Sequence, residues 1–531
     1  MQRYGFVVLF FIVLATPFVM RWVVRGAPVV PPGAAVEPTR LVIVTPHNQD
    51  IRREFAAAFA RWHLENYGTA VEIDFRNVGG TNDIRKLLEN LYSGLRVDGK
   101  LPENAYVGID IVWGGGDFFF GVELDGELGV LQRLDPQADP SLNLDGLLKA
   151  AFPRETLAGV KLREISRDDA GNLLMPKWVG VCLSSFGIVY NPELYERIGI
   201  APPLHWFDLA VPELANLVAL ADPTRSGSAA VAYMMVLQRA MADAEEQLFA
   251  EQPALASLAT AERAKESAYR EAIAAGWKRG MGQLLLIAAN ARYFPDSANL
   301  VPKDVSTADA AAGMAIDFYG RRFTEVVGPR RIQFVSPPAA TAITPDPVAI
   351  LHGVSGEKRK LATRFVAFLL TEQGQLLWIQ RPNTPGGPSV RGLRRPPVRP
   401  DVYADRSLWS DDVNPFEDAG GFNQRSEWMA QFTDTRPIWA AAWIDTREAL
   451  KRAYAAVLRV PDREQRDALL AKLVDLPITL ADVEADTAER RRINREDRAR
   501  APEAATERRM NWARKFRAHY QAVEREANDA R

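Results

Sequence analysis

The sequence predicts an α/β protein with mostly parallel sheets, and three observations lead to this fold class. The chain has 531 residues, more than one ordinary domain needs, which favours two or more lobes. Hydrophobic residues make up 47% and charged residues 25%, a composition typical of globular proteins. Short β-branched runs alternate with amphipathic helical segments, and this order predicts parallel strands with helices on both faces of the sheet.

The first half of the folded region contains three strand–helix units. Leucine, isoleucine and valine dominate the first run, while the first helical segment has apolar residues at helical spacing and ends on a glycine. Thr81, Asn82 and Asp83 are the N-cap candidates of the second helix. The expected elements are a strand over 41–46, a helix over 50–68, a strand over 70–77, a helix over 81–94, a strand over 108–115 and a short helix from Asp117 to 127.

Further units follow, together with regions that break the alternation. The expected elements are a long strand-like run over 178–191, a helix over 191–199, a strand, loop and helix over 217–238, a strand within 310–323 that ends near Asp317 to Tyr319, a strand-like run over 346–354 and a helix over 357–380. Residues 238–278 predict a helical excursion, and 382–400 a Pro/Arg/Gly-rich loop. From about Trp439 a charged helical tail is expected, with Trp512 and Phe516 docking its last helix onto the body.

The N-terminus carries a targeting signal. Gly5 to Met20 contains no charge, Arg3 precedes this run, and Arg21 and Arg25 follow it. As a helix the run spans about 24 Å, and about 30 Å if it continues through Arg21 to Val24. It is therefore either a signal-peptide core, with Gly33-Ala34-Ala35 as the best cleavage site, or an uncleaved anchor.

Composition and motifs weigh against several function classes. The net charge of −2 lacks the basic field of a nucleic-acid binder. Cys182 is the single cysteine, so it forms no internal disulfide and is expected to be a buried small hydrophobe. The sequence has no G-x-S-x-G elbow, P-loop or H-E-x-x-H motif, so we expect no enzyme and no cofactor. A catalytic set assembled from distant residues stays open as an alternative.

Four strings carry a resemblance to a known family. They are GIVYNPELYERIGI, LVALADPTRSGSAA, MAIDFYGRR and DPVAILHGVSGEKRKLATRFVAFLLTEQGQ. Their order and spacing resemble the extracellular solute-binding proteins of ABC importers, in the iron(III)/phosphonate-type branch. The resemblance covers roughly residues 41–380.

The resemblance implies a type II periplasmic-binding fold, in which two α/β lobes are joined by two crossing strands and ligand binds in the cleft. Trp178 to Asn191 would cross into the second lobe, and Gln333 to Ile350 would cross back. The expected organisation is a signal peptide or anchor over 1–26, a linker over 27–39, lobe one over 40–177, lobe two over 178–335 with a helical insertion at 238–278, a return to lobe one over 336–400 and a mostly helical extension over 401–531.

Candidate ligand-binding residues lie at the junctions between strands and helices. Ligands of open α/β sheets sit beyond the carboxyl ends of the strands, where helix N-termini favour anions. Glycines there let a ligand approach the backbone, and serines offer donors to an oxyanion. The candidates are His47, Asn48, Gly80, Thr81, Gly115, Asp117, Ser184, Ser185, Ser226, Gly227, Ser228, Asp317 and Tyr319.

The metal content of the site stays open. Asp317 and Tyr319 lie where iron-binding relatives carry adjacent tyrosines, but Phe318 precedes Tyr319 here and the sequence has no Tyr-Tyr dipeptide. A ferric ion prefers several hard oxygen donors. His47, Asp317 and Tyr319 are therefore alternative metal candidates beside an organic or phosphorus oxyanion.

The expected function is capture of a small anionic or metal-containing ligand for delivery to an ABC permease. The protein is then periplasmic or extracytoplasmic, with membrane contact through residues 5–24 if these are retained and with no nucleic-acid partner. One alternative is a membrane-anchored receptor or sensor module with another partner, and a second is an enzyme on the same fold. Beyond the N-terminus no run of about 20 apolar residues exists, so translocation belongs to other proteins.

Overall fold

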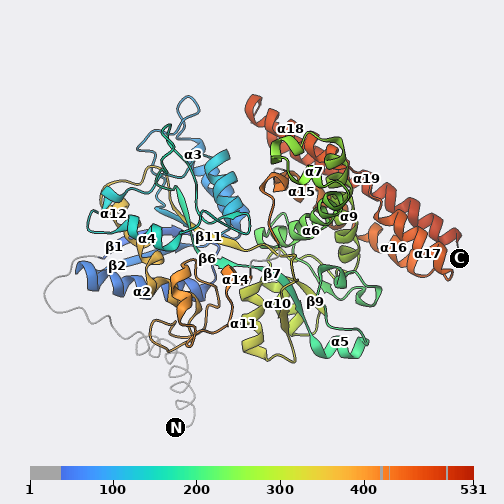
Figure 1. Cartoon of the computed structure of the whole chain (residues 1–531), viewed down its shortest axis with the longest axis horizontal. Helices are drawn as coiled ribbons and strands as arrows, with labels where there is room; N and C mark the ends of the chain where they lie inside the picture. Colours follow the sequence, from blue (N-terminus) through green and yellow to red (C-terminus); the bar gives the residue numbers. More distant parts are fainter. Residues whose placement is uncertain (1–37, 419–421, 430, 498–499, 531) are drawn as a thin grey trace, which may run out of the picture.

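The computed structural model describes residues 38–418, 422–429, 431–497 and 500–530, and shows two α/β lobes with a helical extension (Figure 1). The expected N-terminal segment over 5–24 lies outside the described residues. Within those ranges, no helix is both long and apolar enough to cross a bilayer.

Lobe one is built on a five-stranded sheet with the order β2-β1-β3-β11-β6. Strand β1 (Thr39–Val44) pairs in parallel with both β2 (Val71–Arg76) and β3 (Ile111–Trp113). Its residues 41–44 are all buried, as expected for a β-branched strand covered on both faces. The helices of this lobe are α2 (Gln49–Tyr67), α3 (Thr81–Ser93), α4 (Leu144–Ala151), α12 (Gly356–Leu370) and α13 (Glu372–Ile379).

Two strand-to-strand connections join the sheets of the two lobes. Strand β6 (Trp178–Ser184) belongs to the first sheet and β7 (Phe186–Tyr190) to the second, with only Ser185 between them. The chain returns from β10 (Gln333–Val335) in the second sheet to β11 (Thr344–Ile350) in the first. The predicted fold class, two lobes with crossing strands and a helical extension, is therefore confirmed.

Lobe two has a four-stranded sheet with the order β10-β7-β9-β8. Its further elements are β8 (Val218–Ala219), β9 (Ala312–Ile316), α5 (Pro192–Ile198), α6 (Gly227–Glu251), α9 (Ser267–Ala289), α10 (Leu300–Ser306) and α11 (Asp317–Val327). Helices α6 and α9 pack closely because Gly276 lies where a Cβ would be 2.7 Å from the Ala240 carbonyl oxygen.

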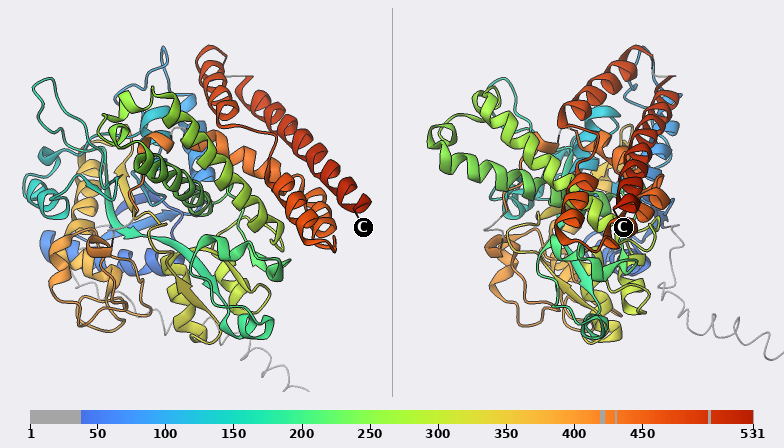
Figure 2. Two further views of the ribbon diagram at one scale, coloured as in Figure 1. Left: turned by 45° about the vertical axis from the view of Figure 1, so that its right-hand side comes forward. Right: turned by 90° about the vertical axis from the view of Figure 1, so that its right-hand side faces the viewer.

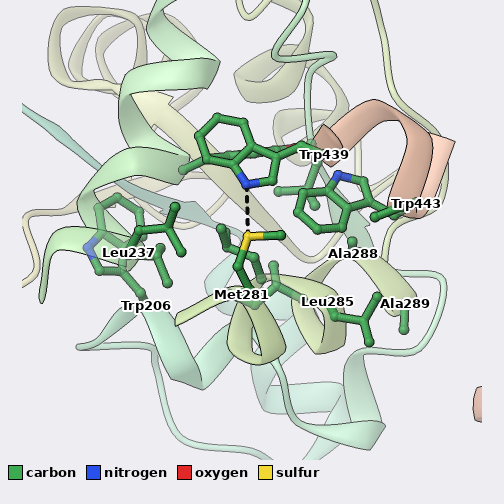
Figure 3. Packing of buried hydrophobic residues seen from close by; sticks show 14 of the residues in the cluster. Trp206, Leu237, Met281, Leu285, Ala288, Ala289, Trp439 and Trp443 are labelled. Atoms are coloured by element: carbon green, nitrogen blue, oxygen red, sulfur yellow. Dashed lines mark hydrogen bonds between the residues drawn. The ribbon is translucent and has the colours of Figure 1, made fainter. Parts of the chain in front are cut away.

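The C-terminal extension packs on lobe two from Phe422 onward, whereas its first part, with Val402, Tyr403 and Trp409, packs on Ile379 of lobe one. Its helices are α15 (Phe432–Trp439), α16 (Arg447–Leu458), α17 (Arg463–Val474), α18 (Leu480–Glu496) and α19 (Ala501–Asp529), and the last four lie along one side of the molecule (Figure 2). The Trp439 indole N–H donates to the Met281 sulfur of α9 at 3.3 Å (Figure 3). Trp512 and Phe516 are both buried in the shared core, as predicted.

Four expected element boundaries are wrong. The run over 178–191 is two strands in different sheets, and the helix over 357–380 is broken at Thr371, which caps α13. Strand β9 ends at Ile316, so residues 317–319 open α11 instead of ending a strand. The N-cap of α3 is Gly80, whose N–H donates to the Asp83 carboxylate at 3.1 Å.

Candidate functional site

A cavity of about 450 Å³ lies between the two lobes. From lobe one it is lined by the segments that follow β1, β2 and β3. From lobe two it is lined by the N-terminal ends of α6, α10 and α11. This is the position beyond the strand ends where open α/β sheets bind ligands.

Of the predicted site residues, all except Ser185 and Asp317 line this cavity. Their contact with a ligand stays a prediction. The lining residues among them are His47, Asn48, Gly80, Thr81, Gly115, Asp117, Ser184, Ser226, Gly227, Ser228 and Tyr319.

Ser185 and Asp317 face each other at the crossing between the lobes. The Ser185 N–H and hydroxyl donate to the Asp317 carboxylate at 3.1 and 3.2 Å, and the Asp317 N–H donates to the Ser185 carbonyl at 3.0 Å. Burial raises the pKa of Asp317 above its usual value. These bonds tie the start of α11 to the linker between β6 and β7, so Asp317 is not part of the cavity wall.

The metal candidates do not meet as a set. His47 and Tyr319 line the cavity, whereas Asp317 does not. In the described part of the chain, no group of three or more His, Cys, Asp and Glu side chains is arranged to hold a metal ion. The metal assignment therefore gains no support from the geometry.

A buried polar network forms the floor of the cavity. His47 Nε2 lies 2.8 Å from Asp346 Oδ2, and Arg395 Nη1 donates to the same oxygen. Asp346 Oδ1 accepts from the Gly115 N–H at 2.7 Å, and Arg395 Nη2 donates to the Ser184 hydroxyl at 2.7 Å. The network therefore joins the first strand–helix junction, the loop after β3, both crossing strands and the segment after α13.

Electrostatics fix the charge states in this network. Burial alone would raise the pKa of Asp346, but the Arg395 guanidinium and the His47 hydrogen bond hold that pKa well below its usual range. Burial lowers the pKa of His47 more strongly than Asp346 raises it, so the imidazole is neutral. The Thr45 hydroxyl, which accepts from the His47 N–H at 3.1 Å, can donate to Nδ1 at 2.9 Å. These partners assign the proton to Nε2, which donates to Asp346.

Asp346 and Arg395 were not predicted. Asp346 sits at a bulge of β11, between Pro345 and Pro347. A charged residue inside an otherwise apolar strand is a signal that sequence reasoning could have used, since buried charges need partners. Arg395 lies in the irregular stretch over 382–400, where no periodicity marks it.

The lobes touch each other at the N-termini of α3 and α6. A Cβ on Gly80 would lie 2.9 Å from the Arg225 carbonyl oxygen, and a Cβ on Gly227 would lie 3.0 Å from the Thr81 hydroxyl oxygen. The Ser226 hydroxyl caps α6 by accepting from the Ala229 N–H at 3.3 Å. This close approach shows the lobes in a closed arrangement.

The charged side chains of the lining are mostly paired. Arg436 bonds Glu123 at 3.4 Å, and Arg225 pairs with Asp296 at the same distance. Asp117 lies at the start of the π-helix η1 (Phe119–Glu127), and burial raises its pKa to about 6. Asp117 is therefore a lining carboxylate whose charge changes near pH 6.

The sequence matches no known protein-family model and no curated protein. Among solved structures the chain is similar to the periplasmic binding protein AfuA from Actinobacillus pleuropneumoniae, at 18% identity and a TM-score of 0.46, with 77% of this chain and 98% of that chain covered.

Two further solved structures show the same level of likeness. The substrate-binding protein of an ABC transporter from Agrobacterium tumefaciens is 12% identical, with a TM-score of 0.46 and coverage of 73% and 87% of the two chains. Iron-bound HitA from Pseudomonas aeruginosa is 15% identical, with a TM-score of 0.41 and coverage of 72% and 92%. At identities this low, the likeness says nothing about what this chain binds.

Proposed function

We propose that this chain is the solute-binding component of an ABC-type importer, which captures a small ligand between its lobes and delivers it to a membrane permease. The single observation that supports this most strongly is the cavity of about 450 Å³ whose walls come from both lobes. A site of this kind is complete only when the lobes are together, so ligand binding favours closure.

The two strand-to-strand connections between the sheets suit a hinge. One is a single residue, Ser185, and the other is the stretch between β10 and β11. Short segments of this kind absorb the backbone rotation of domain closure while the sheets stay rigid. A permease that recognises the closed arrangement would then respond to the ligand-bound protein.

A small anionic ligand is the proposed cargo. The α3 and α6 N-termini both reach the cavity, and the first N–H groups of a helix lack partners within the helix. Arg395 and Arg436 already pair with carboxylates, so main-chain N–H groups and the lining hydroxyls of serine, threonine and tyrosine are the donors proposed for an oxyanion. A metal-containing ligand, as in the iron(III)/phosphonate branch, is the weaker form of the proposal.

An extracytoplasmic location belongs to the same proposal. Residues 5–24 would act there as a signal peptide or as a membrane anchor. The proposal for this segment rests on its uncharged sequence and flanking arginines.

Thermal unfolding with a ligand panel tests the function. The panel contains phosphate, phosphonates, ferric citrate, amino acids, polyamines and sugars. A ligand that binds only the native state adds about 2.7 kcal/mol of stability at a hundredfold excess over its dissociation constant. We expect one anionic class to raise the melting temperature.

The site is tested by a cleft variant and a matched control. The double substitution Ser226→Ala with Ser228→Ala should abolish the shift. Ser267→Ala, at the exposed start of α9, should preserve it. A shift that survives the double substitution would place the ligand outside the cleft.

A further inference from the structure

The C-terminal extension is fixed to lobe two and carries residues that reach lobe one. Trp439, Trp443 and Phe516 belong to the same hydrophobic core as the lobe-two helices α6 and α9. The view in Figure 3 shows Trp439 and Trp443 packed beside Met281 and Leu285 of α9. The extension should therefore move with lobe two when the lobes separate.

Two helices of the extension, α15 and α18, contact lobe one at η1 and at Phe118, the residue before η1. The Gln424 N–H, ahead of α15, also donates to the Ala158 carbonyl of lobe one at 3.0 Å. The Phe432 ring packs edge-on against Phe118, with the ring centroids 4.7 Å apart. Arg436 Nη1 donates to Glu123 at 3.4 Å, and Arg490 Nη1 donates to Glu127 at 3.1 Å. An aromatic contact and two ion pairs thus link these helices to η1 and the residue before it.

These contacts are organised within the extension itself. Arg490 on α18 also donates to Asp434 on α15, at 2.9 and 3.1 Å, so the two helices present their arginines together. Arg436 Nε donates to the Pro223 carbonyl of lobe two at 2.9 Å. Each arginine therefore bridges its own body to a carboxylate of lobe one.

Both ion pairs are partly or largely buried. The side chains of Glu123 and Arg436 are 8% and 12% exposed, and those of Glu127 and Arg490 are 25% and 16% exposed. Pairs shielded from water are screened much less than surface pairs, and removing one partner leaves a poorly solvated charge.

Phe432 and Arg436 also line the cavity between the lobes. We propose that the C-terminal extension forms a third wall of the cleft and holds η1 against lobe two, so that a ligand enters only when this contact opens. The inference rests on the proposed function for its purpose, but the contact can be tested without any ligand.

Accessibility of a cysteine inside the cleft reports this opening. Ser228→Cys places a thiol in the lining, and the single native cysteine, Cys182, is fully buried. A polymer-linked maleimide too large for the closed cavity reacts only with the open protein. We expect Arg490→Ala and Arg436→Ala to speed the reaction about tenfold or more, which corresponds to about 1.4 kcal/mol.

The matched control is Arg492→Ala. Arg492 lies two residues from Arg490 on α18, but among the described residues it pairs with Glu489 and Glu496 of its own helix and not with lobe one, so the labelling rate should stay at the wild-type value. Glu127→Gln removes the lobe-one partner and should reproduce the acceleration without touching the extension.

Equal labelling rates in the wild-type, Arg436→Ala, Arg490→Ala and Glu127→Gln backgrounds would overturn the proposal. An acceleration in Arg492→Ala as large as in Arg490→Ala would do the same. Each variant is also labelled without Ser228→Cys, and reaction of Cys182 in that sample identifies a variant that unfolds. If an arginine variant unfolds, the labelling rate of Glu127→Gln decides whether the contact holds the cleft closed. Because no ligand is present, a negative result here leaves the proposed solute binding intact, and a failed ligand panel leaves this result intact.

Discussion

Replacing Arg395 with methionine tests whether a buried ion pair holds the floor of the cleft. The Arg395 side chain is 3% exposed, and its guanidinium lies 4.6 Å from the centre of the Phe318 ring. Methionine keeps much of the apolar stem and removes the charge. Asp346 would retain its bonds to His47 and to the Gly115 N–H.

The expected cost follows from the carboxylate left behind. Removing one partner of a buried pair costs about 3–5 kcal/mol. An unfolding entropy of about 2.1 cal/mol/K per residue amounts to about 1 kcal/mol/K for a chain of 531 residues, so the melting temperature should fall by about 3–5 °C.

The pKa of Asp346 determines how the stability loss depends on pH. The pKa of Asp346 is depressed in the folded protein, so its stabilisation is present above the unfolded pKa of about 3.9 and is lost as the pH falls through the folded value. Without Arg395, burial raises that pKa instead. The deficit of the variant should therefore be largest at pH 7 and shrink as Asp346 is protonated at lower pH.

Scanning calorimetry at pH 7 and pH 5 measures both effects. Adding Asp346→Asn to Arg395→Met should recover most of the loss, because the neutral amide can still accept from the Gly115 N–H. A loss at pH 7 below about 1 kcal/mol, the level of an exposed ion pair, or a loss independent of pH, would refute the reasoning.

Three further predictions concern the contact between the lobes at Gly80, the titration of Asp117 in the cavity lining and the docking of the extension through Trp439. Gly80→Ala should open the cleft, because the added Cβ would lie 2.9 Å from the Arg225 carbonyl oxygen, while the Gly80 φ of −79° suits alanine. Small-angle scattering should show a larger radius of gyration for this variant. Gly94→Ala should leave the radius unchanged, because its Cβ would have no neighbour within 4 Å. Asp117 has a raised pKa of about 6, so it makes stability fall as the pH rises from about 4 to about 6, and Asp117→Asn should remove that slope in urea titrations. Trp439→Ala should cost about 3–5 kcal/mol by calorimetry, because the side chain is fully buried, and an unchanged melting temperature would contradict the docking of the extension.

The strand–helix order of lobe one was predictable because its local signals agree. Buried β-branched runs predict β1 to β3. Apolar residues at helical spacing that end on Gly68 predict α2, and the structure has that glycine as the C-cap in the left-handed conformation. The expectation of one strand over 178–191 overlooks Ser184 and Ser185, two polar residues that interrupt the apolar run where the chain passes from β6 to β7 and changes strand partners. No glycine or proline is adjacent to the break at Thr371.

The candidate site also contains residues that the sequence could predict and residues that it could not. Residues after strands, such as Gly80 and Ser228, could be predicted because the carboxyl ends of strands meet at one edge in any fold of this class. Arg395 reaches the floor from a segment 348 positions away from His47, and no local pattern encodes such a pairing. The presence of Phe432 and Arg436 in the cavity lining depends on how the extension docks, and the charged sequence of the extension does not specify that docking.

Native mass spectrometry of the protein incubated with the ligand panel tests whether a small molecule binds between the lobes. We expect one small molecule bound per chain. Binding should be lost in Ser228→Trp, which fills the cleft, and kept in Ala518→Trp, which changes an exposed position of α19. Binding that Ser228→Trp leaves unchanged would contradict a ligand site between the lobes.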